Sequence, residues 1–355
     1  MVLNMFTYIK EEQDICMNVF NNRKNILKDF LDSYSIDKPK KIIVFTTGSS
    51  LNAFLCSKLY IEKISNIEIE YKNPSEFISY SNKCYEDNVY YFGISQTGRS
   101  ASAIEAIKKA NNYERSFAVT YSQDSPLAKI SKHFIKIDCG EEKIGFVTKG
   151  MLTTSLTLML LALELAVMNS YITLDKYNEE LKKIEDAILN INKVIEVSID
   201  WVEKNKNDLI NANRIILVSY GSGLGVASEA QTKITETVRI PASFFEMEDF
   251  LHGPCYELKN DSSVIIYLAP NNKLLNDRLI SIMQYLDKYA KKSYYFGCLE
   301  GDNHLVLPKI DEYLSAILYL IPIQYISYKI TEYKGIDLNI KMFPDMDEKL
   351  GRKTL

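Results

Sequence analysis

This 355-residue sequence is poor in histidine and tryptophan and has no large excess of either charge. It contains three histidines and one tryptophan, and its 42 basic and 46 acidic residues leave a formal charge of −4. Nucleic-acid-binding domains usually carry a basic excess, so we expect no nucleic-acid partner. Hydrophobic residues make up 46% and charged residues 25%, which excludes a disordered, collagenous or coiled-coil chain. A chain of this length fits two domains or three.

Patterns that bind metal are also missing. The cysteines form no C-x-x-C pair, and no closely spaced Cys/His cluster of the kind that holds zinc occurs. Their scatter fits reduced, mostly buried thiols, so we expect a cytoplasmic protein that uses no metal. The six cysteines are Cys16, Cys56, Cys84, Cys139, Cys255 and Cys298.

Long apolar runs are limited to one segment. The N-terminus has no apolar stretch of signal-peptide length. Residues 151–168 (MLTTSLTLMLLALELAVM) are apolar enough to resemble a membrane span, but they contain Glu164 and have no basic flank. A buried core helix is the better prediction, and we expect no membrane partner.

Apolar strands alternate with helical segments along the first half. Strands are expected at 41–45, 89–95, 116–122 and 134–140. Helices are expected at 8–35, 51–64, 103–112 and 150–169. This alternation predicts an α/β fold with a parallel sheet covered by helices on both faces.

The same pattern then starts again. The strand and glycine turn at 214–223 are similar to those at 41–50, and the strand at 264–270 is similar to the one at 89–95. Two landmarks at nearly equal offsets indicate a duplicated domain. We therefore expect an N-terminal helix (1–38), a first domain (39–171), a helical connector (172–208), a second domain (209–333) and a tail (334–355).

Two loops of glycine and hydroxyl side chains follow strands of the first half. They are Thr-Gly-Ser-Ser at 47–50 and Ser-Gln-Thr-Gly-Arg-Ser at 95–100. Each lies where open α/β sheets bind ligands, and each opens a helix whose N–H groups attract anions. Neither an ATP P-loop nor G-x-G-x-x-G occurs, so the expected ligand is a phosphate monoester. One loop alone would fit a helix cap equally well. The second half has APNNKL at 269–274 instead, which predicts one site per chain.

Three further segments could carry chemistry. Lys233 and Glu236 share a helix face, which fits either an acid/base with a tuned pKa or a plain surface ion pair. His252 ends a helix before Gly-Pro, either as a proton-transfer group or as a loop histidine with a packing role. The acidic run 246–249 could meet a cationic amine, although such runs are usually solvated. The tail at 345–353 reads from composition as a solvated terminus.

In this order, the motifs resemble the sugar isomerase (SIS) domain family over about residues 20–355. The chain looks most like the isomerase half of glucosamine-6-phosphate synthase and the fructosamine-6-phosphate deglycases. The matching segments are TTGSSLN (46–52), SQTGRS (95–100), EKIGFVTKG (142–150), LHGP (251–254) and IPIQYISYKITEYKGID (321–337). Glu236 and His252 are 16 residues apart, as the proton-transfer glutamate and ring-opening histidine are in that family.

The resemblance implies two tandem SIS domains, each a flavodoxin-like three-layer sandwich, and a set of site residues. Glu236, His252 and Lys233 would be catalytic, with a lysine of the tail, Lys349 before Lys353. The substrate-binding residues would be Gly48, Ser49, Ser50, Ser95, Gln96, Thr97 and Ser100. It also implies a homodimer in which His252 enters the site of the other chain, and no cofactor.

The chain departs from the family pattern in three places. Arg99 replaces the loop's usual glutamate, and the tail does not reproduce the family's sequence. Only about 20 residues precede the match, with no N-terminal cysteine nucleophile, so we expect no use of glutamine as an ammonia source.

The expected function is a fructosamine-6-phosphate deglycase, which splits a 6-phosphorylated Amadori compound into a hexose 6-phosphate and an amine. A glucosamine-6-phosphate deaminase that releases ammonia would share almost every named residue. A plain phosphosugar isomerase would also fit these motifs, as would a sugar-phosphate-sensing protein without catalysis.

Overall fold

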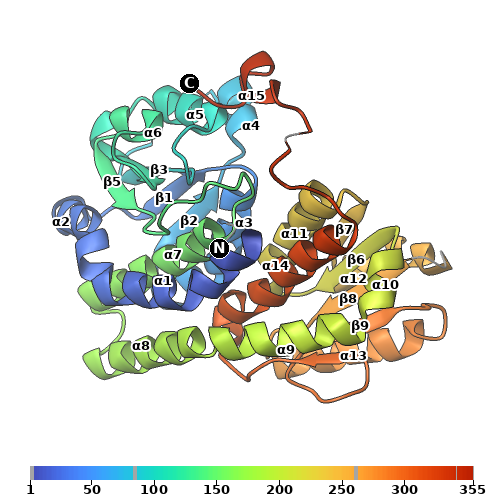
Figure 1. Ribbon diagram of the computed structural model, residues 1–355. Coiled ribbons are helices and arrows are strands. Elements are labelled where there is room, and N and C mark those ends of the chain that lie inside the picture. Colours follow the sequence, from blue (N-terminus) through green and yellow to red (C-terminus); the bar gives the residue numbers. More distant parts are fainter. Residues whose placement is uncertain (1–3, 83–85, 260–262, 341, 355) are drawn as a thin grey trace.

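The computed structural model describes residues 4–82, 86–259, 263–340 and 342–354, and within them the chain forms two parallel five-stranded sheets (Figure 1). The first sheet has the order β2-β1-β3-β4-β5. Its strands are β1 (Lys41–Phe45), β2 (Glu68–Tyr71), β3 (Val89–Ile94), β4 (Ser116–Thr120) and β5 (His133–Lys136). The expected strands of this half are thus present, except that the last ends at Lys136 rather than at residue 140.

The second sheet repeats the topology of the first. Its order is β10-β9-β8-β6-β7, so in both sheets the first strand lies between the second and the third. Its strands are β6 (Arg214–Ser219), β7 (Ala242–Glu246), β8 (Ser263–Leu268), β9 (Ser293–Gly297) and β10 (His304–Val306). The order second-first-third-fourth-fifth is that of flavodoxin-like sheets, which confirms the expected fold class and the duplication.

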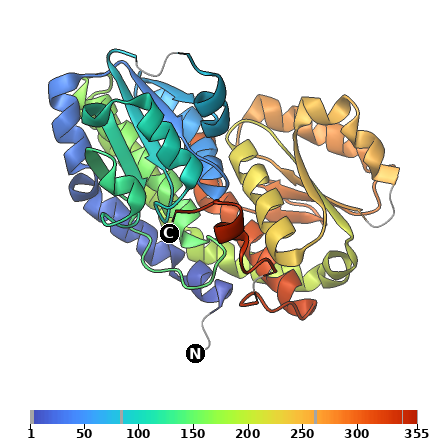
Figure 2. The same ribbon diagram turned by 90° about the horizontal axis from the view of Figure 1, so that it is seen from above.

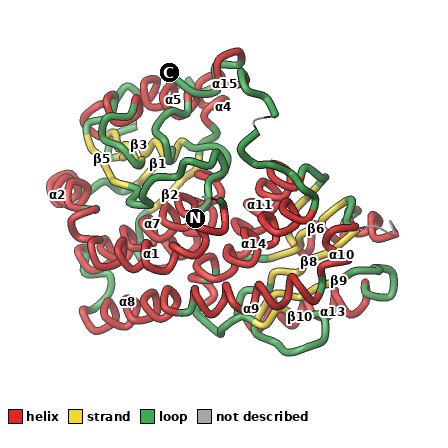
Figure 3. The backbone as a smooth tube through the Cα atoms, in the orientation of Figure 1, coloured by secondary structure: helices red, strands yellow, loops and turns green. Residues whose placement is uncertain are grey.

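Helices cover both faces of each sheet (Figure 3). The helices of the first half are α1 (Met5–Ile26), α2 (Lys28–Asp37), α3 (Ser49–Ile64), α4 (Pro74–Tyr80), α5 (Ala101–Ala110), α6 (Pro126–Lys129) and α7 (Lys149–Met168). Those that follow are α8 (Leu174–Leu189), α9 (Ile191–Lys204), α10 (Lys206–Asn211), α11 (Gly223–Lys233), α12 (Met247–Leu251), α13 (Lys273–Leu286), α14 (Ala316–Tyr333) and α15 (Met346–Lys349). The expected helix at 8–35 is in fact two helices, because the chain breaks at Leu27.

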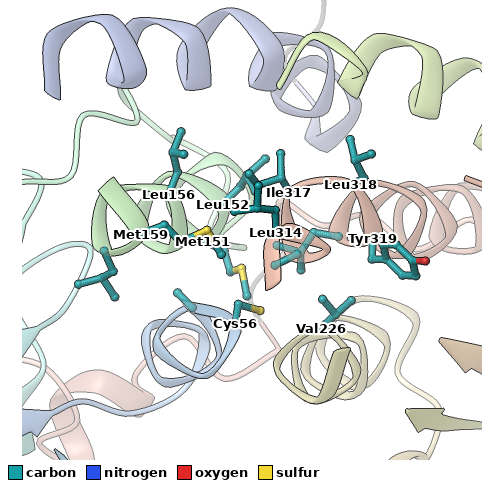
Figure 4. Packing of buried hydrophobic residues seen from close by; sticks show 14 of the residues in the cluster. Cys56, Met151, Leu152, Leu156, Met159, Val226, Leu314, Ile317, Leu318 and Tyr319 are labelled. Carbon is teal, nitrogen blue, oxygen red and sulfur yellow. The ribbon is translucent and has the colours of Figure 1, made fainter. Parts of the chain in front are cut away.

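The two halves share one central layer of helices. Successive residues of a strand point to opposite faces. On β1, Ile42 and Val44 therefore face the cluster that includes α1, α3 and α7, whereas Ile43 and Phe45 face α4 and α5. The first cluster continues without a break into α9, α11 and α14 and onto the second sheet. Figure 4 shows α3, α7, α11 and α14 meeting at this point.

The apolar segment 151–168 lies in helix α7, within this central layer. Of its 18-residue window, 89% is buried inside the protein, so it packs as a core helix. Cys16, Cys56 and Cys139 are buried free thiols, and Cys255 and Cys298 are partly buried. Cys84 lies outside the described residues.

Candidate active site

The two hydroxyl-rich loops lie side by side at the carboxyl ends of β1 and β3, where the strand order of the first sheet reverses. Helix α3 begins after Gly48, whose φ of +62° is one that L side chains rarely adopt. Neither α3 nor α5 is capped by a side chain. In the described part of the chain, no protein group bonds the hydroxyls of Ser50, Ser95 and Thr97. These loops therefore leave their hydroxyls, and the N–H groups at the start of α3, open to an anion.

The corresponding place in the second half is closed. Tyr220 is buried and its hydroxyl donates to the backbone oxygen of Pro270. Ser222, the counterpart of Ser49, donates to the Glu312 carbonyl at 2.6 Å. Both hydroxyl groups bond to backbone carbonyls of the protein itself and are not open to a ligand. This is in keeping with one site per chain.

Gln96 of the second hydroxyl-rich loop bonds to the segment that precedes α7. Its Nε2 donates to Glu142 Oε2. The Glu142 carboxylate in turn accepts from three backbone N–H groups at the start of α7, those of Thr148 (2.9 Å), Lys149 (3.0 Å) and Gly150 (3.1 Å). A Cβ at Gly150 would lie 2.1 Å from Gln96 Nε2, so only glycine leaves room for this contact. In this arrangement the Gln96 amide faces Glu142.

Helices α3 and α11 bring the second half to the first loop. A Cβ at Gly225 would lie 2.5 Å from the backbone nitrogen of Cys56, so the two helices are close. Across this contact Glu229 accepts from Ser49 Oγ at 3.1 Å and from Asn52 Nδ2 at 2.7 Å. The Ser49 hydroxyl, expected to bind substrate, thus bonds to Glu229 here.

Glu229 begins a buried array of charges on α11. Lys233 is 1% exposed, with its Nζ 3.3 Å from Glu229 and in contact with Glu236. Glu229 is fully buried, whereas the Glu236 side chain is 34% exposed and accessible from outside. Lys233 and Glu236 are therefore more than a surface ion pair, because the lysine has no access to solvent.

The local backbone and the electrostatics are both unusual. Glu236 lies in η2 (Ile234–Val238), a π-helical turn that continues α11, and such turns are frequent at functional sites. Burial raises the pKa of Glu229, against the pull of Lys233 and the donor bonds of Asn52 and Ser49. Burial also disfavours the charged form of Lys233, but the attraction of Glu236 and Glu229 outweighs it and raises the lysine's pKa. Lys233 thus stays an ammonium that holds Glu236 in place.

The tail returns to the second hydroxyl-rich loop (95–100), as Figure 2 shows. Lys353 forms an antiparallel β-bridge with Ser100 and lines a cavity of about 300 Å³ together with Gln96, Thr97, Tyr121 and Glu142. Lys349, the tail lysine placed first on sequence grounds, is 69% exposed and does not line this cavity. The structure thus places Lys353, not Lys349, at the second hydroxyl-rich loop.

Within the described residues of one chain, no hydrogen bond or ion pair joins His252 to these groups. It is exposed at the end of α12, where its backbone N–H bonds to Asp249. In the acidic run beside it, Glu246 caps α12 and Glu248 forms a two-bond pair with Arg278 (2.7 and 3.0 Å). Two of its carboxylates therefore have partners already, which weakens the idea that the run receives a cationic amine.

Asn52 and Glu142 lie in segments that resemble the family (46–52 and 142–150) but were given no role, and Glu229 was not named at all. The spacing of Glu229 and Lys233, four residues apart with the acid first, could have suggested an ion pair. Nothing in the sequence indicates that Asn52 or Glu142 would bond across elements. In the described ranges, no group of three or more His, Cys, Asp or Glu side chains could hold a metal ion.

A second, larger cavity carries none of the candidate residues. It has a volume of about 580 Å³ and is lined by α1, α2 and the edge strand β5. The loops described above, rather than this cavity, hold the residues that can do chemistry.

Comparison with known families agrees with the fold and the loops. The family model described as SIS domain matches residues 35–169, which contain the first sheet and both hydroxyl-rich loops. Residues 35–169 are therefore similar to the SIS domain family. With the repeated topology of the second sheet, the chain is an α/β protein of two tandem flavodoxin-like domains.

The names of its relatives refer to a phosphorylated sugar, fructose 6-phosphate. The chain is 24% identical over 329 residues to the glutamine–fructose-6-phosphate aminotransferase (isomerizing) of Haemophilus influenzae, covering 90% of this chain and 53% of that protein. The enzyme of the same name from Francisella tularensis is 26% identical over 321 residues, 85% of this chain and 50% of that protein. The chain thus spans about half the length of these relatives.

Solved structures are similar over nearly the whole chain. A protein of Clostridium difficile 630, named a "putative phosphosugar isomerase", is 28% identical with a TM-score of 0.89 and covers 99% of both chains. The C-terminal domain of the Francisella tularensis aminotransferase is 20% identical, with a TM-score of 0.86, and covers 95% of this chain and 98% of that one.

Proposed function

We propose that the chain is a fructosamine-6-phosphate deglycase that releases a hexose 6-phosphate and a free amine. The observation that carries the proposal is the cavity in which the phosphate loop, through Gln96 and Thr97, meets the tail lysine Lys353. Its rim carries Glu141 and Tyr121, which suits an amine substituent with a positive charge. The relatives' names describe the transfer of an amino group and fructose 6-phosphate, and the proposed reaction breaks such a carbon–nitrogen bond.

Each group has a role in the proposed reaction. The hydroxyls of Ser50, Ser95, Thr97 and Ser100 anchor the phosphate, and the Lys353 ammonium can neutralise its charge. His252 moves a proton to the ring oxygen and opens the ring. Glu236, held by Lys233, removes a proton from C1 and returns it to C2 through an enolamine. Water then adds to the resulting C1 imine. The C1–N bond breaks, which gives the C1 aldehyde of the hexose 6-phosphate and the free amine.

The proposal extends to the assembly. His252 is exposed and no contact joins it to Glu236 in the chain described. We infer a homodimer in which each chain supplies His252 to the site of the other. The proposed protein uses no cofactor, because the imine of the substrate itself delocalises charge.

The test is product release from a panel of 6-phosphorylated Amadori compounds. Hexose 6-phosphate and free amine should appear in equal amounts, and in deuterated water the product should carry deuterium at C2. Glu236→Gln should lower kcat by ~10²–10⁴-fold and leave KM nearly unchanged, because the loops are intact. The matched control is Glu179→Gln, which removes an exposed pair of the same spacing with Lys176 (2.9 Å) and should retain full activity.

Each competing function gives a different result in this assay. Ammonia from glucosamine 6-phosphate, without amine release from the panel, would replace the deglycase by a deaminase. Interconversion of hexose phosphates alone would make it a plain isomerase. Binding without turnover would make it a sensor. If the Glu236→Gln variant kept the wild-type kcat, Glu236 would have no part in the chemistry.

A further inference from the structure

Arg99 and the tail residue Thr354 are joined by a set of mutual hydrogen bonds. Arg99 Nε donates to the Thr354 carbonyl at 2.8 Å. In the other direction the Arg99 carbonyl accepts from Thr354 N at 2.9 Å and from Thr354 Oγ1 at 3.3 Å. Two residues further along the chain, Ala101 N donates to the Arg352 carbonyl at 3.2 Å. The tail thus attaches to both sides of Ser100, through backbone and side chain together.

An arginine suits this place better than an acidic residue would. The guanidinium carries only donors and can bond the Thr354 carbonyl. A carboxylate carries only acceptors when ionised, so it would face that carbonyl without a proton to share. Arg99 is otherwise exposed, and its guanidinium has no other hydrogen-bond partner or ion pair in the parts of the chain that the structure describes.

The attachment determines which tail lysine reaches the loop. Lys353 lies between the two bonded residues Arg352 and Thr354, opposite Ser100, and lines the cavity with Gln96 and Thr97. Asp347 stiffens the turn before it by pairing with Arg352 Nε at 2.6 Å and with Lys353 Nζ at 3.4 Å. Lys349, four residues earlier, is left at the surface.

We propose that Arg99 is a positioning residue, which docks the tail on the phosphate loop and thereby holds Lys353 at the cavity. Its effect on catalysis rests on the proposed function, whereas its effect on the tail does not. In an enzyme of this kind the tail lysine would be absent from the site whenever the tail is released. Arg99 would then act on turnover through Lys353 and not by touching the sugar.

Limited proteolysis of the full chain measures docking without any substrate. Trypsin cuts after lysine and arginine, and cleavage after Lys349 and Arg352 can be followed by intact mass. Arg99→Ala should speed cleavage at these two sites by roughly 10-fold or more, because a charged hydrogen bond is lost. Arg99→Lys, which keeps a charged donor, should lie between Arg99→Ala and the wild type. Arg115→Ala is the matched control, since Arg115 lies just before β4, at the end of the sheet opposite the loop.

A second variant alters the tail instead of Arg99. Thr354→Pro removes the N–H that bonds to Arg99 and leaves the loop unaltered, so it should release the tail to a similar extent. In turnover assays both variants should lower kcat/KM for the phosphorylated substrate, and Arg99→Lys should restore part of it. Wild-type cleavage rates in both Arg99→Ala and Thr354→Pro would overturn the proposal. Faster tail cleavage in a protein that turns over no sugar phosphate would support the docking role and contradict the proposed function.

Discussion

At the scale of single residues, Thr97 offers the most direct test of the phosphate loop. It is exposed, it lines the cavity, and its hydroxyl has no partner among the described protein groups. Thr97→Val keeps the shape and removes the donor. The loss of one hydrogen bond to a charged group should cost ~1.5–3 kcal/mol, or roughly 10–150-fold in KM. Steady-state kinetics with the phosphorylated substrate measure this, and the unphosphorylated compound should show no such change. An unaltered KM would contradict the phosphate assignment.

Glu12 is a buried acid with no role in the proposed chemistry. It is 1% exposed on α1, and within the described residues neither of its carboxyl oxygens has a hydrogen-bond partner, nor does Gln324 Oε1 on α14. Burial raises the pKa of Glu12 well above its usual value, and Glu142 adds to the effect, while Gln324 and Lys149 oppose it. Burial, which takes the carboxylate out of water, therefore favours the neutral form of Glu12.

This burial predicts a pH-dependent stability. The folded chain keeps the Glu12 proton at pH values where the unfolded chain, with a pKa near ~4.3, has released it. The free energy of unfolding should therefore fall as pH rises from that value through the folded pKa, by ~1.4 kcal/mol per unit of pKa difference. Glu12→Gln cannot lose a proton, so its advantage over the wild type should grow between pH 5 and pH 8.

Urea unfolding at the two pH values measures that change. Glu62→Gln, an exposed glutamate on α3, is the control and should follow the wild-type pH dependence. A wild type and a Glu12→Gln variant that lose stability in parallel would show that Glu12 is ionised in the folded protein.

At the scale of elements, the sequence predicted six of the ten described strands and missed four, two of which are short strands at the edge of a sheet. β1, β3, β4, β5, β6 and β8 were expected, and β2, β7, β9 and β10 were not. β2 is four residues with two glutamates (EIEY), and β10 is three residues long. Edge strands of this kind carry too little apolar periodicity to be distinguished from loops.

The contact between helices α3 and α11 joins the two halves of the site. Gly225 allows it, because a Cβ there would lie 2.5 Å from Cys56 N and 2.9 Å from Cys56 Cα. On an exposed helix, glycine to alanine stabilises by about 1 kcal/mol. Here Gly225→Ala must push the helices apart, so we expect a loss of roughly 1–3 kcal/mol and a lower kcat as Glu229 withdraws from Ser49 and Asn52.

Urea unfolding gives the sign of this effect. Gly145→Ala is the comparison for stability, because a Cβ at that position meets nothing within 4 Å. If Gly225→Ala raised the free energy of unfolding as an ordinary helical substitution does, the close approach of α3 and α11 would not matter for the fold.

At the scale of the whole molecule, the sequence could predict which residues follow a strand but not which distant segments meet. The hydroxyl-rich loops and the Lys233–Glu236 pair were found because local spacing carries the signal. The return of the tail to Ser100, the choice of Lys353 and the bonds of Glu229 to Ser49 depend on contacts more than 170 residues apart in sequence. The composition of the tail alone indicated a solvated terminus, whereas the structure gives it a short helix and a β-bridge.

The position of His252 bears on the assembly. It is exposed on α12, on the outer layer of the second sheet, while Glu236 follows α11 in the central layer. If the proposed reaction needs both groups at one sugar, a second chain has to supply the histidine. Glu236→Gln and His252→Asn homodimers should then each be nearly inactive, because every site in them lacks one group.

Mixing the two variants tests this arrangement. Random exchange between equal amounts gives half mixed dimers, and each of these contains one site with both an intact Glu236 and an intact His252. Activity should therefore recover to about a quarter of the wild-type value. Subunit exchange is verified by mass spectrometry with one chain isotopically labelled, and a mixture of wild type with His252→Asn is the control for exchange itself. No recovery in a mixture shown to have exchanged would place His252 in the site of its own chain, and a change of conformation within one chain would then be needed to bring it to Glu236.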